Sequence, residues 1–209
     1  MKKIFSFIMA AGMLLLLAVS CQNEQAVTEA VNEEPQINKT MEDLLTRRSI
    51  RQYTDEVPPM EVIEEICKAG TYAPTGMNRQ SPIIIAVTNK EMRDRMSQLN
   101  AQVMGRDGDP FYGAPVVLVV LADKNVFTHV EDGSLVMGNL MNAAHAMGLG
   151  SCWIHRAKEV FESEEGQQIL KDLGIEGDYV GIGNCILGYV DGDYPEARPR
   201  KDNYVYWIK

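Results

Sequence analysis

Residues 47–53 read RRSIRQY, a stretch that gathers three arginines within five residues. Arg47, Arg48 and Arg51 need anionic partners in a chain whose formal net charge is −9. A guanidinium presents a planar fork of donors that suits phosphate oxygens, and the hydroxyl of Ser49 adds one more donor. The segment therefore predicts a phosphate site. A solvated basic turn, the more common structure for a charge run, stays open as the alternative.

A second stretch, residues 73–80, reads APTGMNRQ and lies between a predicted helix and a predicted buried strand. Pro74 and Gly76 favour a loop, and glycine permits close approach of the backbone to a ligand. The hydrogen-bonding side chains of the loop are those of Thr75, Asn78 and Gln80. An ordinary connection between a helix and a strand needs less polar functionality, so this stretch predicts a ligand-binding loop.

A third stretch, residues 148–155, reads GLGSCWIH and follows a long apolar helix. The glycines end the helix, and the chain continues extended, so that its backbone N–H groups can face a planar ligand. A dinucleotide-binding G-x-G-x-x-G motif is excluded here, because Trp153 occupies the last glycine position and a helix comes first.

A second basic cluster, RPRK at residues 198–201, lies far from the first in sequence. Its arginines, Arg198 and Arg200, can close on the same anion as residues 47–51 if the fold brings the two clusters together. A basic tail in solvent is the alternative. A chain this acidic does not bind nucleic acid by bulk charge.

The apolar pattern predicts alternating helices and strands. Helices are expected at residues 41–47, from Pro58-Pro59 onward, after a capping Asn89 with Met92, Met96, Leu99 and Val103 on one face, at 133–147 and at 158–173. Strands are expected at residues 83–87, 116–121, 180–189 and 204–208. Because the central strands are continuous apolar runs, we expect a sheet covered by helices.

The first twenty residues are typical of an export signal. Lys2 and Lys3 precede an apolar run from Ile4 to Val19, and small residues then lead to Cys21. The pattern resembles a bacterial lipoprotein signal, in which Cys21 is lipidated and becomes the first mature residue. We therefore expect a signal peptide at 1–20, a disordered tether at 21–40 and a folded domain at 41–209, exported and anchored to the membrane. An anchor helix left in place is the alternative.

Other chemistries are less well supported by the residues. There is no His-x-x-x-His or Cys-x-x-Cys spacing, so we expect no metal site. A hydrolase with Cys152 as nucleophile and His155 as base is a rival hypothesis. In an extended segment, however, a spacing of three residues points the two side chains to opposite faces.

Taken in order and spacing, R-R-S-I-R-Q-Y, A-P-T-G-M-N-R-Q and G-L-G-S-C-W-I resemble the nitroreductase family of flavoproteins, and the likeness runs from Met41 to Lys209. The resemblance implies an α+β fold with a central mixed sheet flanked by helices. It also implies an intertwined homodimer with FMN at the subunit interface. The helix Gly133 to Met147 is similar to the family's central dimer helix.

The resemblance also implies roles for individual residues. The FMN phosphate, ribityl chain and pyrimidine edge would be held by Arg47, Arg48, Ser49 and Arg51. The partner subunit would contact the flavin through Thr75, Gly76 and Asn78. The isoalloxazine would be lined by Cys152, Trp153 and Ile154, with a backbone N–H near N5. Arg200 would reach the phosphate, with Arg198 as a further candidate.

The activity implied is that of an FMN-dependent oxidoreductase working by ping-pong transfer through flavin N5, with a nitroaromatic, a quinone or an enone as acceptor. The donor would be NAD(P)H or, outside the cytoplasmic membrane, a membrane redox partner. The loop from Gly105 to Gly113 is short and leaves the acceptor undefined. A lipoprotein that holds flavin without turnover is the alternative from another class.

Overall fold

The computed structural model describes residues 38–209. The expected signal peptide, Cys21 and nearly all of the expected tether lie outside this range. The chain divides into two units, residues 1–42 and residues 43–209. The helix α2 (Lys39–Thr46) begins in the first unit, and everything below concerns the second. Across residues 38–209, no helix is both long and apolar enough to cross a bilayer.

A four-stranded sheet forms the centre of the second unit, in the order β1-β2-β4-β3. Its strands are β1 (Pro82–Val87), β2 (Val116–Asp123), β3 (Gly150–Ile154) and β4 (Tyr179–Gly188). All three strand pairs are antiparallel. Within residues 38–209, parallel pairing is limited to one isolated bridge between Ser49 and Ser151. Among the described residues the sheet is therefore antiparallel, not mixed as expected.

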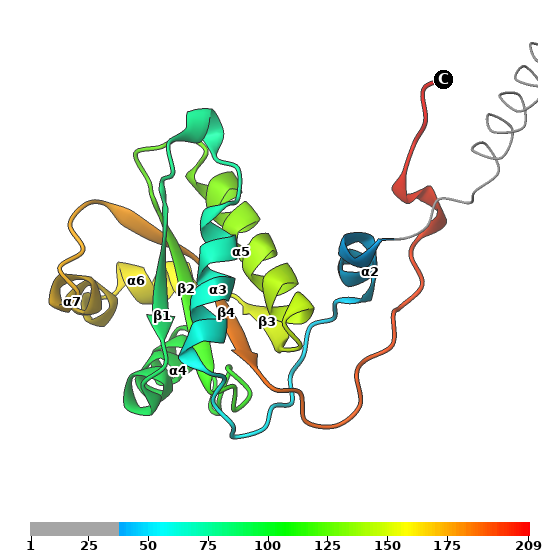
Figure 1. Ribbon diagram of the computed structural model, residues 1–209. Helices are drawn as coiled ribbons and strands as arrows, with labels where there is room; N and C mark the ends of the chain where they lie inside the picture. The colour runs from blue at the N-terminus through cyan, green and yellow to red at the C-terminus, as the bar shows by residue number, and fades with distance from the viewer. Residues whose placement is uncertain (1–37) are drawn as a thin grey trace, which may run out of the picture. The chain divides into compact units, whose positions relative to one another are not determined.

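Helices cover both faces of the sheet (Figure 1). One face carries α3 (Met60–Thr71) and α5 (His129–Ala146). The other face carries α4 (Lys90–Met104), α6 (Ala157–Glu162) and α7 (Glu164–Asp172). Because both faces are covered, the apolar run from Val116 to Ala122 has no exposed surface. The expected sheet covered by helices is confirmed.

Local signals locate some helix ends well. The Asn89 side chain accepts a hydrogen bond from the Met92 N–H at 2.9 Å, which is the expected cap of α4. Gly105 ends the same helix in the left-handed conformation, with φ of 64°. The helix expected at 133–147 begins four residues earlier, at His129, so that two acidic residues occupy its first turn.

The prediction of a single helix at 158–173 is wrong, because the helix is interrupted at Ser163 and forms α6 and α7. The Ser163 hydroxyl accepts from the Gly166 N–H at 3.2 Å and caps the second helix. A serine side chain that bonds its own backbone competes with helix continuation, and here it reorients the chain. Gly166 then lies directly against the backbone of Val160, where a side chain would collide.

The strand expected at 204–208 is also wrong for a single chain. Residues Asp202–Tyr204 form a short 3-10 turn, and the residues after it pair with no strand in the described part of the chain. Tyr206 is 80%, Trp207 78% and Ile208 104% exposed. The apolar segment thus lacks a neighbouring strand within the described residues.

Candidate functional site

The arginine segment docks on the edge strand β3. The Ile50 N–H donates to the Ser151 carbonyl at 2.9 Å, and Ser49 forms the parallel bridge with Ser151. Ile50 is 2% exposed, and the Tyr53 hydroxyl donates to its carbonyl at 2.8 Å. Two motifs that are about a hundred residues apart in sequence are thereby neighbours in the fold.

Two of the arginines keep unused donors. Nη1 of Arg47 and Nε of Arg48 are buried without a hydrogen-bond partner in the described chain. The Nη1 of Arg48 donates to the carbonyls of Leu45 and Arg47, each at 2.9 Å, which orients its guanidinium. A buried cationic donor without a partner is costly, so the arrangement suits an anionic ligand that accepts these bonds.

Arg47 lies close to the β3–β4 pair. Burial raises the pKa of the Cys185 thiol to about 12, and the positive charge of Arg47 opposes that rise. Cys185 is the register partner of Trp153, whose indole Nε1 is a further buried donor without a partner in the described residues. The indole lies over Gly183, where a Cβ would be 2.6 Å from Nε1. Unused donors therefore come from both the arginine segment and β3.

The three residues expected to line a flavin ring lie on two faces of β3. Trp153 packs on the face covered by α3 and α5, whereas Cys152 and Ile154 pack among the residues under α4, α6 and α7. Successive side chains of a strand point to opposite faces, so one flat ligand cannot contact all three side chains. On the Trp153 face, Cys152 and Ile154 therefore offer only their backbone groups to the ring that they are expected to line.

The same alternation separates the rival catalytic pair. Cys152 is 1% exposed, and the nearest acceptor to its thiol is the Trp153 carbonyl, 3.7 Å away. His155 is exposed beyond the end of β3, and its carbonyl accepts from the Asn100 amide at 2.9 Å. A buried thiol and an exposed imidazole do not form a nucleophile and base.

The 73–80 loop is strained. The φ values of Met77, Asn78 and Gln80 are 53°, 53° and 50°. These values lie in the left-handed region, which residues other than glycine rarely adopt. The Gln80 N–H donates to the Thr75 hydroxyl at 3.0 Å and closes the loop on itself. Strain of this kind persists where surrounding bonds over-determine the backbone, often at binding sites.

Asp132, in the first turn of α5, accepts the hydrogen bonds that fix the 73–80 loop against the rest of the fold. Its carboxylate is 3% exposed and accepts from the Gly76 N–H at 2.9 Å, the Thr128 hydroxyl at 3.0 Å and the Ser81 hydroxyl at 3.2 Å. Asp132 was not among the residues predicted for the site, because the predicted helix begins one position later, at Gly133. An acidic residue just before a predicted helix was the available signal.

The C-terminal segment passes the arginines without bringing its own arginines to them. Val190 bridges Tyr53, and the Tyr194 hydroxyl accepts from the Arg48 N–H at 3.0 Å. Arg198 and Arg200 then lie exposed on the segment beyond. Within residues 38–209 of one chain, no hydrogen bond or ion pair joins Arg198 or Arg200 to residues 47–51.

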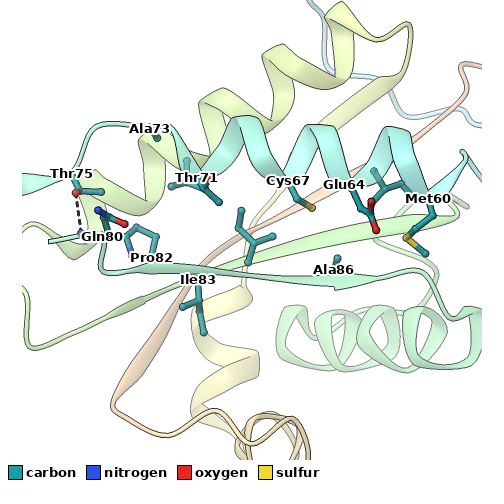
Figure 2. A pocket seen from close by; sticks show the side chains of 13 residues that line it. Met60, Glu64, Cys67, Thr71, Ala73, Thr75, Gln80, Pro82, Ile83 and Ala86 are labelled. Carbon is teal, nitrogen blue, oxygen red and sulfur yellow. Dashed lines mark hydrogen bonds between the residues drawn. The ribbon is translucent and has the colours of Figure 1, made fainter. Parts of the chain in front are cut away.

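Two hollows flank the free edge strand β1. A groove of about 600 Å³ lies between α3 and β1, with Met60, Cys67 and Thr71 of the helix facing Ala86 and Pro82 of the strand (Figure 2). A smaller pocket of about 200 Å³ lies on the other face of the same strand, lined by residues of β1, α4 and α7. Neither hollow was predicted from the sequence.

The comparisons with known proteins decide the family. The model of the nitroreductase family matches residues 44–110 and 101–189. The chain belongs to the nitroreductase family. It is 33% identical, over 165 residues, to an Archaeoglobus fulgidus protein named as an NADH dehydrogenase/NAD(P)H nitroreductase, covering 75% of this chain and 90% of that protein.

Two solved nitroreductases with bound FMN have similar structures. The Bacteroides fragilis protein has a TM-score of 0.74 at 25% identity and covers 82% of this chain and 100% of its own. The Desulfitobacterium hafniense protein has a TM-score of 0.73 at 27% identity and covers 83% of this chain and 100% of its own. The expected family and fold are confirmed for the folded domain.

Replacing Asp132 with asparagine will release the strained loop. One acceptor oxygen is lost, so at least one of the Gly76, Ser81 and Thr128 donors is left unpaired, and the free energy of unfolding falls by about 2 kcal/mol. Hydrogen exchange of the Gly76 amide will be faster than in the parent. Glu131→Gln removes an exposed charge from the same helical turn and is the matched control. Equal exchange in all three proteins would contradict the role of Asp132.

Proposed function

We propose that this nitroreductase-family chain is a donor-linked FMN oxidoreductase that reduces small organic acceptors of the nitroaromatic, quinone or enone class. The unused buried donors of Arg47 and Arg48 carry the proposal, because a phosphate is the anion that guanidinium forks match best. The bound FMN of two structural relatives and the NAD(P)H-linked name of a sequence relative support it.

The residues present fit FMN. Arg47, Arg48 and Ser49 would take the phosphate and ribityl end, and Arg51, exposed on the same segment, would take the pyrimidine edge. Trp153 would contribute its indole N–H and its ring face. Thr75, Gly76 and Asn78 would come from a second subunit, since the loop makes no bond to the arginines within the described chain.

When bound, FMN supplies the redox chemistry, accepting a hydride at N5 and passing electrons to a second substrate in ping-pong order. The chain's contribution is orientation and charge. Arg51 would place a positive charge at the N1/O2 edge, where negative charge develops on reduction. The β3 backbone near Trp153 would present an N–H toward N5. The donor is NAD(P)H, or a membrane redox partner if the domain is exported.

Arg47→Ala will weaken FMN binding by about 10- to 100-fold, because charge-assisted hydrogen bonds contribute about 1.5–3 kcal/mol each. Fluorescence titration of the apoprotein with FMN measures the change. Arg106→Ala removes an exposed arginine of the 105–113 loop and is the matched control. Unchanged affinity in Arg47→Ala would remove Arg47 from the site.

The visible spectrum of the parent protein separates the function classes. Bleaching of bound flavin by NADH or NADPH, followed by recovery with a quinone or a nitroaromatic, supports the oxidoreductase. Bound flavin that no donor reduces favours a flavin-binding lipoprotein without turnover. A protein that takes up no FMN contradicts both.

The homodimer expected from the family follows from the same proposal. β1 is an edge strand with hollows on both of its faces, and open edges with apolar surroundings are sites of strand addition. Residues 204–208 form a continuous run of aromatic and β-branched residues, and all are exposed. They belong to a segment that leaves the domain beside residues 48–53, which lie at the β3 edge, opposite β1. We propose that they pair with β1 of a second subunit.

This exchange would also resolve the separation of the two basic clusters. As the segment crosses to the second subunit, Arg198 and Arg200 would pass the subunit interface. There they could approach residues 47–51 of either subunit. The side chains of Tyr204, Tyr206 and Ile208 would enter one hollow, and those of Val205 and Trp207 the other, because strand side chains alternate.

Deleting residues 204–209 will weaken the dimer by at least about tenfold, because each buried Tyr, Trp or Ile side chain contributes about 1.5–3 kcal/mol. Sedimentation across a concentration series measures the dissociation constant. Deleting Lys209 alone leaves the apolar segment in place and serves as the control. A truncated chain that dimerises as tightly as the parent would rule out pairing at β1.

We further propose that the mature chain is exported and anchored through lipid on Cys21, as the first twenty residues predict. Several acyl chains on one cysteine anchor stably, since each buried CH₂ contributes about 0.8 kcal/mol. The acidic stretch after Cys21 would hold the domain away from the membrane surface.

Cys21→Ala will abolish incorporation of radiolabelled palmitate and release the protein from the membrane fraction. Cys67→Ala changes a cysteine within the folded domain and is the control that keeps the label. Membrane retention without label would instead favour an uncleaved anchor helix.

A further inference from the structure

The tight turn at residues 109–113 displays a tyrosine in an unfavourable backbone conformation. Tyr112 has φ of 52° and is 40% exposed. A bulky side chain is rarely found in the left-handed region, and glycine would remove the strain. The turn therefore carries an aromatic side chain at a position where the backbone conformation favours glycine.

Bonds among Asp109, Arg93 and the turn backbone form a bracket that holds the turn in place; Arg93 is buried, whereas Asp109 is exposed. The Asp109 carboxylate accepts from the Phe111 N–H at 2.9 Å and from the Gly113 N–H at 2.7 Å. Arg93, which is 7% exposed, donates to Asp109 at 2.6 Å and to the Ala114 carbonyl at 2.8 Å. Partial removal from water would by itself raise the pKa of Asp109, but these bonds, together with one from the Ser97 hydroxyl, hold the pKa below its ordinary value. The backbone at Tyr112 is thus over-determined by its surroundings.

The ring that the bracket displays lies under Arg51. The guanidinium carbon of Arg51 is 5.9 Å from the centroid of the Tyr112 ring. Within the described chain, no carboxylate forms an ion pair with Arg51. An arginine resting on an aromatic face keeps its in-plane N–H donors available, so the contact orients the group without consuming its hydrogen bonds.

We propose that Tyr112 is a positioning residue that holds Arg51 at the pyrimidine edge of the flavin and thereby raises the reduction potential of bound FMN. The inference rests on the proposed function, in which Arg51 faces N1/O2. Reduced flavin carries the negative charge there, so a correctly held guanidinium stabilises the reduced form more than the oxidised form. In this proposal, the role of the ring in holding Arg51 accounts for a tyrosine at a strained position.

Tyr112→Gly separates the ring from the strain. Glycine adopts the same φ at no steric cost, so thermal stability will equal or exceed that of the parent. FMN binding will nevertheless weaken by about three- to tenfold, and the midpoint potential of bound FMN will become more negative. Tyr112→Asn, which tolerates this φ without an aromatic ring, gives the same result by a second route. Tyr112→Phe keeps the ring and the parent's potential.

A double variant tests whether Tyr112 acts through Arg51. Arg51→Met removes the charge and also makes the potential more negative, and adding Tyr112→Gly to it will produce no further shift. Additive shifts would overturn the inference, as would a Tyr112→Gly protein with the parent's potential and FMN affinity. If Arg51→Met lowers the potential while Tyr112→Gly does not, the proposed function stands and this inference fails. If the parent protein binds no FMN, both fail.

Discussion

The hydrogen bond from the Ile50 N–H to the Ser151 carbonyl is the contact on which the site depends. It fastens the arginine segment to the edge of the sheet and buries Ile50 in the core. Because the register is fixed there, Arg47 is held close to the β3–β4 pair and Arg51 is directed toward the 109–113 turn. If this contact shifted by one residue, each arginine would exchange faces with its neighbour.

Two carboxylates, the buried Asp132 and the exposed Asp109, support the two strained loops through several hydrogen bonds each. Asp132 binds the 73–80 loop from the start of α5, and Asp109 binds its own turn with the help of Arg93. Each carboxylate accepts hydrogen bonds from several donors, so removing it leaves those donors without their partner. Both loops contain residues other than glycine at positive φ, a conformation that glycine adopts with less strain.

Within residues 38–209, a single copy of the chain leaves several groups without partners. The β1 edge is open, with a hollow on each face, and the apolar residues after the last turn are exposed. The buried donors of Arg47 and Arg48 are unused within the described residues. A second subunit would cover the apolar surfaces, and a phosphate would satisfy the donors. The unpaired groups in one chain are therefore complementary to what a dimeric flavoprotein would supply.

The sequence by itself determined the features that depend on neighbours in the chain. Local patterns predicted the buried strand β2 and the Asn89 cap, and the three ordered motifs predicted the family. The tertiary structure decided what depends on distant contacts. It divided the helix at Ser163, separated Cys152 from Trp153 across the sheet, and revealed Asp132 and the bracket under Tyr112. It also left residues 204–208 unpaired within the described chain. A run of aromatic and β-branched residues favours the extended conformation, whereas a strand exists only where a second backbone satisfies its hydrogen bonds.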